Sequence, residues 1–301
     1  MVPVTETLSL SEFHLIVKVL ATVYMSLGVL GWIGNGFILW TTIRSKNLRK
    51  TCNILIAIQC CSDIIHQMGH VPFIYFAYNE LWIPQRTCYY INFLSFSCLD
   101  ISTISTLFIA LDRLICVKFP ALHSGLETKV FVGLVLGTSF VYTSAVKVLS
   151  YLNLVDDPTM CFVPESLPPA IGGLWFICSS ILNCAVIAIY VILVCVSKGS
   201  FSGSKSLNKS INTIVVAHIF GWFFTMASTM TMKMLNPSRL VALSVEAAVG
   251  IGVNTNIVVP VFIYYCRSSL YRQEFRKVLG LAQNSQVRAV SSFKSDAPAP
   301  R

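Results

Sequence analysis

An acidic and a basic residue stand side by side at the end of a long apolar stretch. The pair is Asp112 and Arg113, within the segment 109–120. A charged guanidinium is costly in hydrocarbon, so Arg113 must lie at an interface, in a water-filled cavity or against a partner group. An arginine held by a neighbouring acid can exchange partners when a cavity opens. The pair is therefore a candidate two-state switch.

Other polar residues interrupt the apolar runs. Asp63 follows Asn53 and Gln59, and an aspartate this deep costs about 2.5–3.5 kcal/mol on membrane-insertion scales, so it must face other helices. His66 and His70 lie three and seven positions later, on the same helical face. Two histidines could hold a metal or sense pH, but they do not complete a zinc site. We favour polar walls of a cavity or satisfied core groups.

The composition shows which elements must position these residues. The 301 residues are 55% apolar and 12% charged, with a mean hydropathy of +0.71, which is typical of a membrane protein. Seven apolar runs are each long enough to span a bilayer. We predict an all-α membrane protein, a seven-helix bundle, with spans at about 16–43, 52–78, 88–117, 130–151, 169–197, 211–234 and 239–265.

The basic residues predict the orientation. With the N-terminus outside, seventeen Lys and Arg fall on the cytoplasmic side and five on the outer side, as the positive-inside rule requires. The net charge of +9 then reflects topology and attraction to anionic membrane lipid, and no nucleic-acid partner is expected. We expect a multi-pass protein of the cell membrane.

This orientation singles out two of the eleven cysteines. Cys88 opens span three and Cys161 lies between spans four and five, both on the outer, oxidising side, whereas the other nine lie in spans or on the reducing side. A bridge would close a loop of about seventy residues and contribute about 4 kcal/mol in the chain-entropy model. Two unrelated free thiols are the alternative.

The chain divides into four parts. We expect an extracellular N-terminus at 1–15, the membrane domain at 16–265, an amphipathic helix on the inner leaflet at 266–280 and a disordered cytoplasmic tail at 281–301. Span three carries many hydroxyls and is predicted to lie at the centre. Lys147, near the outer end of span four, is expected to snorkel to the interface, and Pro72 to kink span two.

Several of these features occur together in one family. Gly34-Asn35 in span one, Asp63, Cys88 placed before Asp112-Arg113, a loop Cys161 and Tyr264 before a basic amphipathic helix resemble a rhodopsin-like (class A) G-protein-coupled receptor. The segments 112–120 and 264–272 are most similar to nematode serpentine chemoreceptors of the srsx type. The resemblance covers residues 16–280.

The resemblance implies roles for particular residues. Arg113 would engage a heterotrimeric G protein, Asp112 would restrain it in the inactive state, and Tyr264 would swing inward on activation. A polar core, with a possible bound sodium ion and no other cofactor, would be formed by Asn35, Asp63, Ser102 and Asn256. Arrestin is a further partner that the resemblance suggests.

The chain also departs from this family. Leu114 replaces the usual tyrosine after the arginine, and spans five and six contain no internal proline, so Trp222 lacks the usual kink. Pro260 and Val261 stand where the family has Asn-Pro before Tyr264. No carboxylate occurs near the start of span six to pair with Arg113. These departures bear on activation and coupling.

The ligand is predicted from the outer half of the bundle. Ser95 stands where amine receptors of the family have a carboxylate, which disfavours a biogenic amine. A small molecule between the helices is favoured, and a short basic neuropeptide attracted to Glu246, Asp156 and Asp157 is the alternative. The candidate lining consists of His66, His70, Asn92, Ser95, Trp222, Glu246 and Asn254, each of which could equally serve as an interhelical bond.

Other function classes fit less well. A retinal protein would need a lysine in span seven, and 241–265 has none. A seven-span transporter or channel is the alternative from another class, but the first and last three runs show no self-similarity. No nucleophile-base pair or metal-binding spacing indicates an enzyme.

Overall fold

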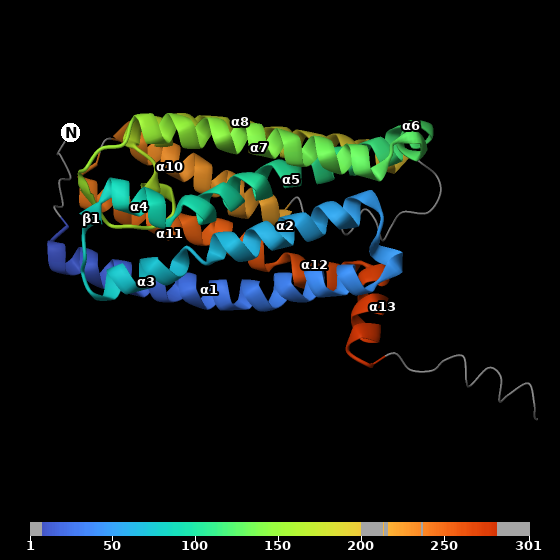
Figure 1. Cartoon of the computed structure of the whole chain (residues 1–301), viewed down its shortest axis with the longest axis horizontal. Coiled ribbons are helices and arrows are strands. Elements are labelled where there is room, and N and C mark those ends of the chain that lie inside the picture. Colours follow the sequence, from blue (N-terminus) through green and yellow to red (C-terminus); the bar gives the residue numbers. More distant parts are fainter. Residues whose placement is uncertain (1–7, 200–212, 214–215, 236, 282–301) are drawn as a thin grey trace, which may run out of the picture.

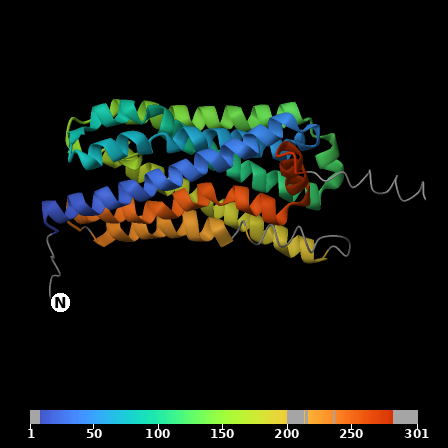
Figure 2. The ribbon, with the colours of Figure 1, turned by 90° about the horizontal axis from the view of Figure 1, so that it is seen from below.

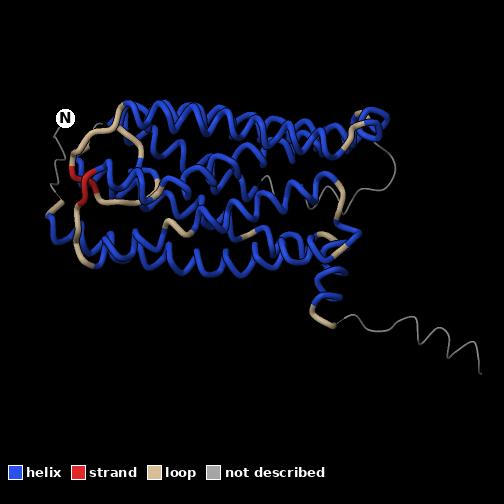
Figure 3. The backbone as a smooth tube through the Cα atoms, viewed as in Figure 1, coloured by secondary structure: helices blue, strands red, loops and turns tan. Residues whose placement is uncertain are grey.

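The computed structural model describes residues 8–199, 213, 216–235 and 237–281, which form a bundle of helices lying side by side (Figure 1). A view at right angles shows the same lengthwise arrangement (Figure 2). The loops gather at the two ends of the bundle (Figure 3). The end that holds the start of α1 and strand β1 is called the outer end, and the end that holds α13 the inner end (Figure 1).

The elements follow one another along the chain with few long connections. The long helices are α1 (Leu10–Arg44), α2 (Thr51–Gln67), α5 (Phe93–Lys118), α7 (Thr128–Leu152), α8 (Pro169–Gly199), α10 (Phe224–Leu235) and α11 (Arg239–Val258). Shorter ones are α3 (His70–Tyr78), α4 (Gln85–Ile91), α6 (Pro120–Gly125), α12 (Pro260–Arg267) and α13 (Ser269–Val278). Single turns are η1 (Lys46–Leu48), η2 (Pro164–Ser166) and η3 (Ile219–Phe223), and the strands are β1 (Ile83–Pro84) and β2 (Pro158–Thr159).

Five helical stretches in the described part of the chain are long and apolar enough to cross a membrane: Leu10–Arg44, Phe93–Lys118, Thr128–Leu152, Pro169–Val196 and Arg239–Arg267. They correspond to predicted spans one, three, four, five and seven. Predicted span two is divided between α2 and α3, and predicted span six begins in residues outside the described ones. The prediction of an all-α protein is confirmed, with five helices long and apolar enough to span a membrane.

Some predicted segments fall outside the described residues. These are the tail after Leu281, the first seven residues and the segment between α8 and Thr213. Helix α1 begins six residues before the expected start of span one. Ser9 and Glu12 form a capping box there, which satisfies two of the N–H groups that a helix start leaves without partners.

The second span is interrupted between α2 and α3. Pro72 has no N–H to donate to the carbonyl of Met68, four residues earlier, and its ring crowds that carbonyl. The break therefore lies a turn before Pro72. Gly69 occupies it, and a Cβ at this position would lie 2.6 Å from Cγ2 of Val163 in the outer loop. A glycine is needed for this close approach.

Helix α5 lies at the centre of the bundle, where it packs against α2, α7 and α8. Its hydroxyl residues are buried, among them Ser95, Ser97, Ser102, Thr103 and Ser105. Several of these hydroxyls donate to carbonyls one turn earlier in the helix. Hydroxyls that bond to the backbone of their own helix or to neighbouring helices can be buried away from lipid. The central position of α5 therefore agrees with the position predicted for span three.

The turn η3 (Ile219–Phe223) is a π-helix. A π turn holds one residue more than an α turn and is a recognised cause of helix distortion. The turn contains Trp222, which is buried. Span six therefore has a local distortion at its tryptophan although it lacks proline.

The same turn brings span six unusually close to α11. A Cβ on Gly221 would lie 2.6 Å from Cβ of Asn256 and 3.0 Å from the carbonyl oxygen of Gly252. Small residues allow two membrane helices to approach in this way. The contact between η3 and α11 thus depends on the absence of a side chain at 221.

At the inner end, α13 packs two rings against the bundle. Tyr271 stacks on Tyr264 with ring centroids 4.8 Å apart, and Phe275 lies 4.6 Å from the ring of Phe37. Burial by itself raises the pKa of Glu274, but hydrogen bonds from Lys277 and Asn47 outweigh it and hold that pKa below the usual range. The helix is therefore fixed to α12 and α1 by its rings, and to η1 by the hydrogen bond between Asn47 and Glu274.

The close contact at Gly221 predicts a stability effect. Gly221→Val should lower the melting temperature of the detergent-solubilised protein by several degrees, since overpacking costs about 1–3 kcal/mol. Gly133→Val is the matched control, because a Cβ at Gly133 in α7 meets nothing within 4 Å. Equal melting temperatures for the two variants would contradict the close approach.

Candidate functional site

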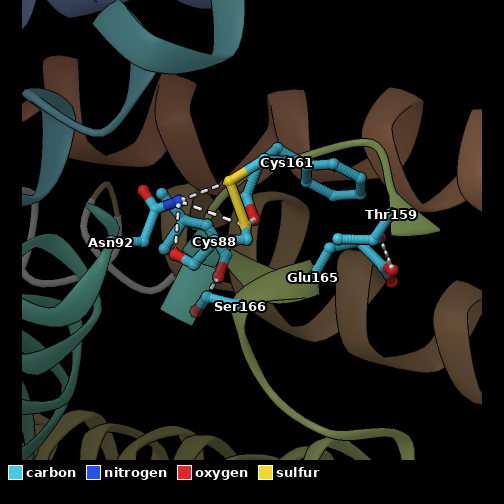
Figure 4. The surroundings of a disulfide bond; sticks show 8 residues. Cys88, Asn92, Thr159, Cys161, Glu165 and Ser166 are labelled. Carbon is cyan, nitrogen blue, oxygen red and sulfur yellow. Dashed lines mark hydrogen bonds between the residues drawn. A yellow bond between two sulfur atoms is a disulfide. The ribbon is translucent and has the colours of Figure 1, made fainter. Parts of the chain in front are cut away.

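A disulfide joins the outer loop to the start of the central helices. Cys88 of α4 and Cys161 are bonded, with their Cα atoms 5.5 Å apart (Figure 4). The predicted bridge is confirmed, and the alternative of two free thiols is wrong. Strands β1 and β2 pair antiparallel beside it, with Ile83 opposite Thr159. The loop between α7 and α8 is thus held across the outer end.

Asn92 belongs to this disulfide rather than to a ligand cavity. Its Nδ2 donates to Sγ of Cys161 at 3.2 Å and lies 3.6 Å from Sγ of Cys88 (Figure 4). The residue occupies the break between α4 and α5 and is fully buried. It helps to fix the bridge above α5.

Below the loop lies a partly open cavity, here called the outer chamber. Its volume is about 60 Å³. Five of the seven predicted ligand residues line it: His66, His70, Trp222, Glu246 and Asn254. Asn92 and Ser95 do not line it. Ser95 instead donates to the carbonyl of Ile65 at 3.3 Å.

Most of the chamber wall is aromatic or apolar. These aromatic and apolar wall residues could not be predicted from the sequence, because an aromatic ring in an apolar run gives no sign of whether it faces lipid or a cavity. They come from α1, α3, α5, α8, α10, α11 and the outer loop: Tyr24, Phe73, Leu99, Phe162, Val163, Trp175, Phe176, Met226 and Val253. The loop residues are positioned by the neighbouring disulfide.

The polar groups of the chamber are few. His70 Nε2 lies 2.6 Å from Oδ1 of Asn254, and His66 Nδ1 lies 3.2 Å from the carbonyl of Ser95. The hydroxyl of Thr229 makes no hydrogen bond to the described residues although its side chain is buried. An apolar pocket with a few fixed polar groups is typical of a small-molecule site.

A wider cavity, here called the vestibule, adjoins the chamber toward the outer end. The two share Pro164, Phe176 and Glu246. The vestibule is also lined by Asp157, Glu165 and Arg239, so three carboxylates face one guanidinium. Arg239 donates to the carbonyl of Pro158 at 2.6 Å. The predicted candidate Asp156 is not part of this lining, and it pairs instead with Arg86 at 3.0 Å.

Ion pairs close the outer surface around these cavities. Lys18 donates to Glu80 at 2.6 Å and His14 contacts the same carboxylate at 2.9 Å, which lowers the pKa of Glu80. These exposed contacts join α1 to the loop before β1.

The predicted polar core is brought together only in part. Ser102 donates to Oδ1 of Asp63 at 2.6 Å, and Asp63 is 1% exposed. Asn35 donates instead to the carbonyl of Ile257 at 3.3 Å. Asn256 lies against η3 and lines a third cavity, here called the inner cavity, together with Gln59, Thr106, His218 and Tyr264.

The structure gives Asp112 a partner other than Arg113. His123 of α6 places Nε2 3.2 Å from Oδ1 of Asp112. Within the described residues no carboxylate lies within 4.0 Å of the Arg113 guanidinium. Arg113 interacts electrostatically with Cys52, Tyr264, Tyr190 and Asp112 itself. The sequence analysis missed His123, whose position depends on how α6 packs after the end of α5.

Lys147 does not snorkel as expected. Its side chain is 5% exposed and its Nζ lies between 4.5 and 5.3 Å from the ring centroids of Tyr89, Phe93 and Phe96. The buried residues of α7 include Ser139, Thr143, Val146, Lys147 and Ser150. Their helical spacing could have indicated an inward-facing polar stripe.

No metal centre is evident in the part of the chain that the structure describes, where no three His, Cys, Asp or Glu side chains gather. The remaining candidate for a cation is the Asp63–Ser102 pair, which supplies two oxygen atoms. The functional features are therefore the chamber with its vestibule and the inner cavity next to Arg113.

Comparisons with known proteins agree with this arrangement. Residues 28–279 match the sequence profile of the family described as serpentine type 7TM GPCR chemoreceptor Srsx. The chain is 30% identical to the probable G-protein coupled receptor npr-8 of Caenorhabditis elegans over 99 residues, which cover 32% of this chain and 20% of that protein.

Two vertebrate receptors are also similar. Identity to the human neuropeptide Y receptor type 2 is 26% over 207 residues, 65% of this chain and 52% of the receptor. Identity to melanopsin of Phodopus sungorus is 29% over 153 residues, 50% of this chain and 31% of that protein. The matched regions span from a fifth to about half the length of these relatives.

Proposed function

The chain belongs to the serpentine type 7TM GPCR chemoreceptor family Srsx, and from this premise we propose that it is a cell-surface chemosensory receptor for a small ligand. It is a receptor rather than an enzyme, and its family implies a ligand and a heterotrimeric G protein as partners. The observation that best supports this function is the aromatic chamber beneath the loop that the disulfide holds. The match to a receptor family favours this function over a transporter or channel.

We propose seven membrane spans with the N-terminus outside. The spans are α1, α2 with α3, α4 with α5, α7, α8, η3 with α10, and α11 with α12. The distribution of Lys and Arg supports this orientation. The Cys88–Cys161 bond supports it too, because disulfides persist on the oxidising side. Helix α13 would lie on anionic lipid of the inner leaflet, with its basic residues at the headgroups.

The inner cavity supports a switch at Arg113. Tyr264 lines this cavity and interacts with Arg113, so an outward movement of span six would open the guanidinium to a G-protein segment. Asp112 interacts electrostatically with Arg113 and also contacts His123, so it would restrain the arginine and hold α6 against α5. Arrestin would use the same opened inner end.

The ligand class follows from the shape and charge of the outer cavities. A small chamber with largely apolar walls favours a small molecule. The vestibule favours a positive group on that ligand, because Asp157, Glu165 and Glu246 outnumber Arg239 there. A short basic peptide is the second candidate, and the similarity to a neuropeptide Y receptor supports it.

A bound sodium ion is a further proposal. Asp63 and Ser102 offer two oxygen atoms 2.6 Å apart, and oxygen ligands suit a hard cation. Asn256 would have to turn from the inner cavity to contribute a third. The oxygen atoms of Asp63 and Ser102 thus supply part of the coordination that a sodium ion needs.

Coupling through Arg113 can be tested with second-messenger assays in cells that express the protein. Pools of volatile and soluble metabolites and a neuropeptide library serve as ligands. Arg113→Ala should abolish the response at normal surface expression. It should also remove the increase in ligand affinity that a G protein causes, about 5–150-fold for coupled sites. Lys118→Ala, an exposed basic residue on the same helix, is the control. A full response from Arg113→Ala would refute this role.

The charge of the vestibule can be tested without knowing the ligand. Ala242→Cys places a thiol in its wall, and intact cells are treated with methanethiosulfonates that carry either a trimethylammonium or a sulfonate group. The ratio of the labelling rate of the cationic reagent to that of the anionic reagent should be higher at this thiol than with a free thiol in solution. The reason is that carboxylates concentrate cations. Asp157→Asn and Glu246→Gln should each reduce this preference, as should high salt.

The wild-type chain, treated with the same reagents, serves as the control and gives the background labelling of its own cysteines. A preference for the sulfonate reagent would contradict a cationic ligand. If the Ala242→Cys variant gains labelling over this background only in permeabilised cells, the proposed orientation is wrong.

Sodium binding can be tested by thermal unfolding at constant ionic strength, with sodium replaced by N-methylglucamine. Sodium should raise the melting temperature of the wild-type protein, since an ion that binds only the folded state stabilises it. Asp63→Asn should remove the dependence, whereas Asn35→Ala should keep it. An identical sodium response in Asp63→Asn would exclude this carboxylate as the ligand.

A further inference from the structure

Lys147 is the buried lysine among the residues whose side chains the structure describes. Its Nζ makes no hydrogen bond to described residues and faces the rings of Tyr89, Phe93 and Phe96, the nearest centroid 4.5 Å away. Cation–π contacts offset part of the cost of burying an ammonium group. They do not neutralise its charge, so a compensating anion is expected nearby.

Asp100 of α5 is the matching anion. It is 1% exposed, its Oδ1 accepts a hydrogen bond from Nε1 of Trp175 at 2.8 Å, and its Oδ2 has no partner in the described residues. Asp100 and Lys147 interact electrostatically, although their charged atoms are more than 4.0 Å apart. Two opposite charges, each with an unsatisfied atom, therefore lie in one region between α5, α7 and α8.

Three contacts bind this region together. Phe96 lies one helical turn before Asp100, and its ring contacts both the Lys147 ammonium and the Trp175 indole, at 4.5 and 5.0 Å. The hydroxyl of Tyr89 donates to the carbonyl of Lys147 itself at 3.0 Å. The ammonium is thus held over the face of Phe96.

Trp175 connects these charges to the outer chamber. It lines the chamber, whereas neither Lys147 nor Asp100 does. The Asp100 carboxylate holds the nitrogen edge of the indole, so the orientation of this wall depends on the state of the carboxylate. A charged acceptor makes a stronger hydrogen bond than a neutral one.

We propose that Lys147 and Asp100 form a charge pair inside the bundle, and that this pair positions Trp175 as a wall of the outer chamber. The charge of Lys147 favours the ionised form of Asp100, and Asp100 fixes the indole. The pair thereby determines which ligand shapes the chamber accepts. That last role rests on the proposed receptor function, whereas the pair itself does not.

The pair is tested by a double-mutant cycle on the melting temperature of the detergent-solubilised protein. Lys147→Met leaves a buried carboxylate without its cation, and Asp100→Asn leaves a buried ammonium without its anion. Each should lower the melting temperature by about 5 °C or more. The double variant contains neither charge, so its loss should be clearly smaller than the sum of the two.

Two further variants serve as controls. Lys147→Arg keeps the charge and should retain most of the stability. Thr143→Val alters a buried residue one turn away in α7 and should combine additively with Asp100→Asn. Additive losses for Lys147→Met and Asp100→Asn would overturn the charge pair. If a single variant fails to reach the membrane, recovery of surface expression in the double variant supports the pair, and continued loss overturns it.

The positioning of Trp175 needs its own measurement. With 5-fluorotryptophan incorporated, the ¹⁹F signal of Trp175 is assigned by its loss in Trp175→Phe. Lys147→Met should shift this signal more than those of Trp32 and Trp40, and Lys147→Arg should restore it. A fixed Trp175 signal together with a lowered melting temperature would overturn the positioning role and leave the pair purely structural. Neither measurement uses a ligand or a G protein, so both outcomes are independent of the proposed function.

Discussion

Polar groups inside this bundle must find partners within the protein, because the surrounding hydrocarbon offers none. The buried contacts follow from this constraint. Asp63 and Ser102 join α2 to α5, His70 and Asn254 join α3 to α11, and Asp100 and Trp175 join α5 to α8. Each contact links two helices, and α5 takes part in two of the three. The helix arrangement is therefore specified by a small number of polar pairs as well as by apolar packing.

The outer end adds a covalent constraint to these pairs. The bond between Cys88 and Cys161 holds the loop so that Phe162 and Val163 face into the chamber. Gly69 allows Val163 to approach α3 at the break of span two. The disulfide-held loop thus covers the chamber at its outer side, and the vestibule beside this loop opens toward the outer end. If the proposed receptor function is correct, charge in the vestibule and apolar walls in the chamber would divide ligand recognition between two successive sites.

Much of this was predictable from the sequence, and the failures have physical causes. Hydropathy located the five spans that the described helices match, and the predicted orientation singled out the two cysteines that form the disulfide. The cost of burying charge predicted that Asp63 would face inward. The position of Lys147 near the end of span four wrongly predicted that its side chain would reach the membrane interface. The side chain faces inward because Lys147 lies on the same buried polar stripe of α7 as Ser139, Thr143 and Ser150. The contact of His123 with Asp112 depends on tertiary packing, which no local pattern records.

The π turn at Ile219–Phe223 has a consequence for how this chain is compared with its relatives. Such a turn is an α-helix with one residue inserted, and one residue corresponds to about 100° of rotation around the axis. Against a relative whose sixth span is uninterrupted, a correct alignment contains a single-residue gap within these five positions. A gap placed elsewhere would assign lipid-facing residues to the cavity.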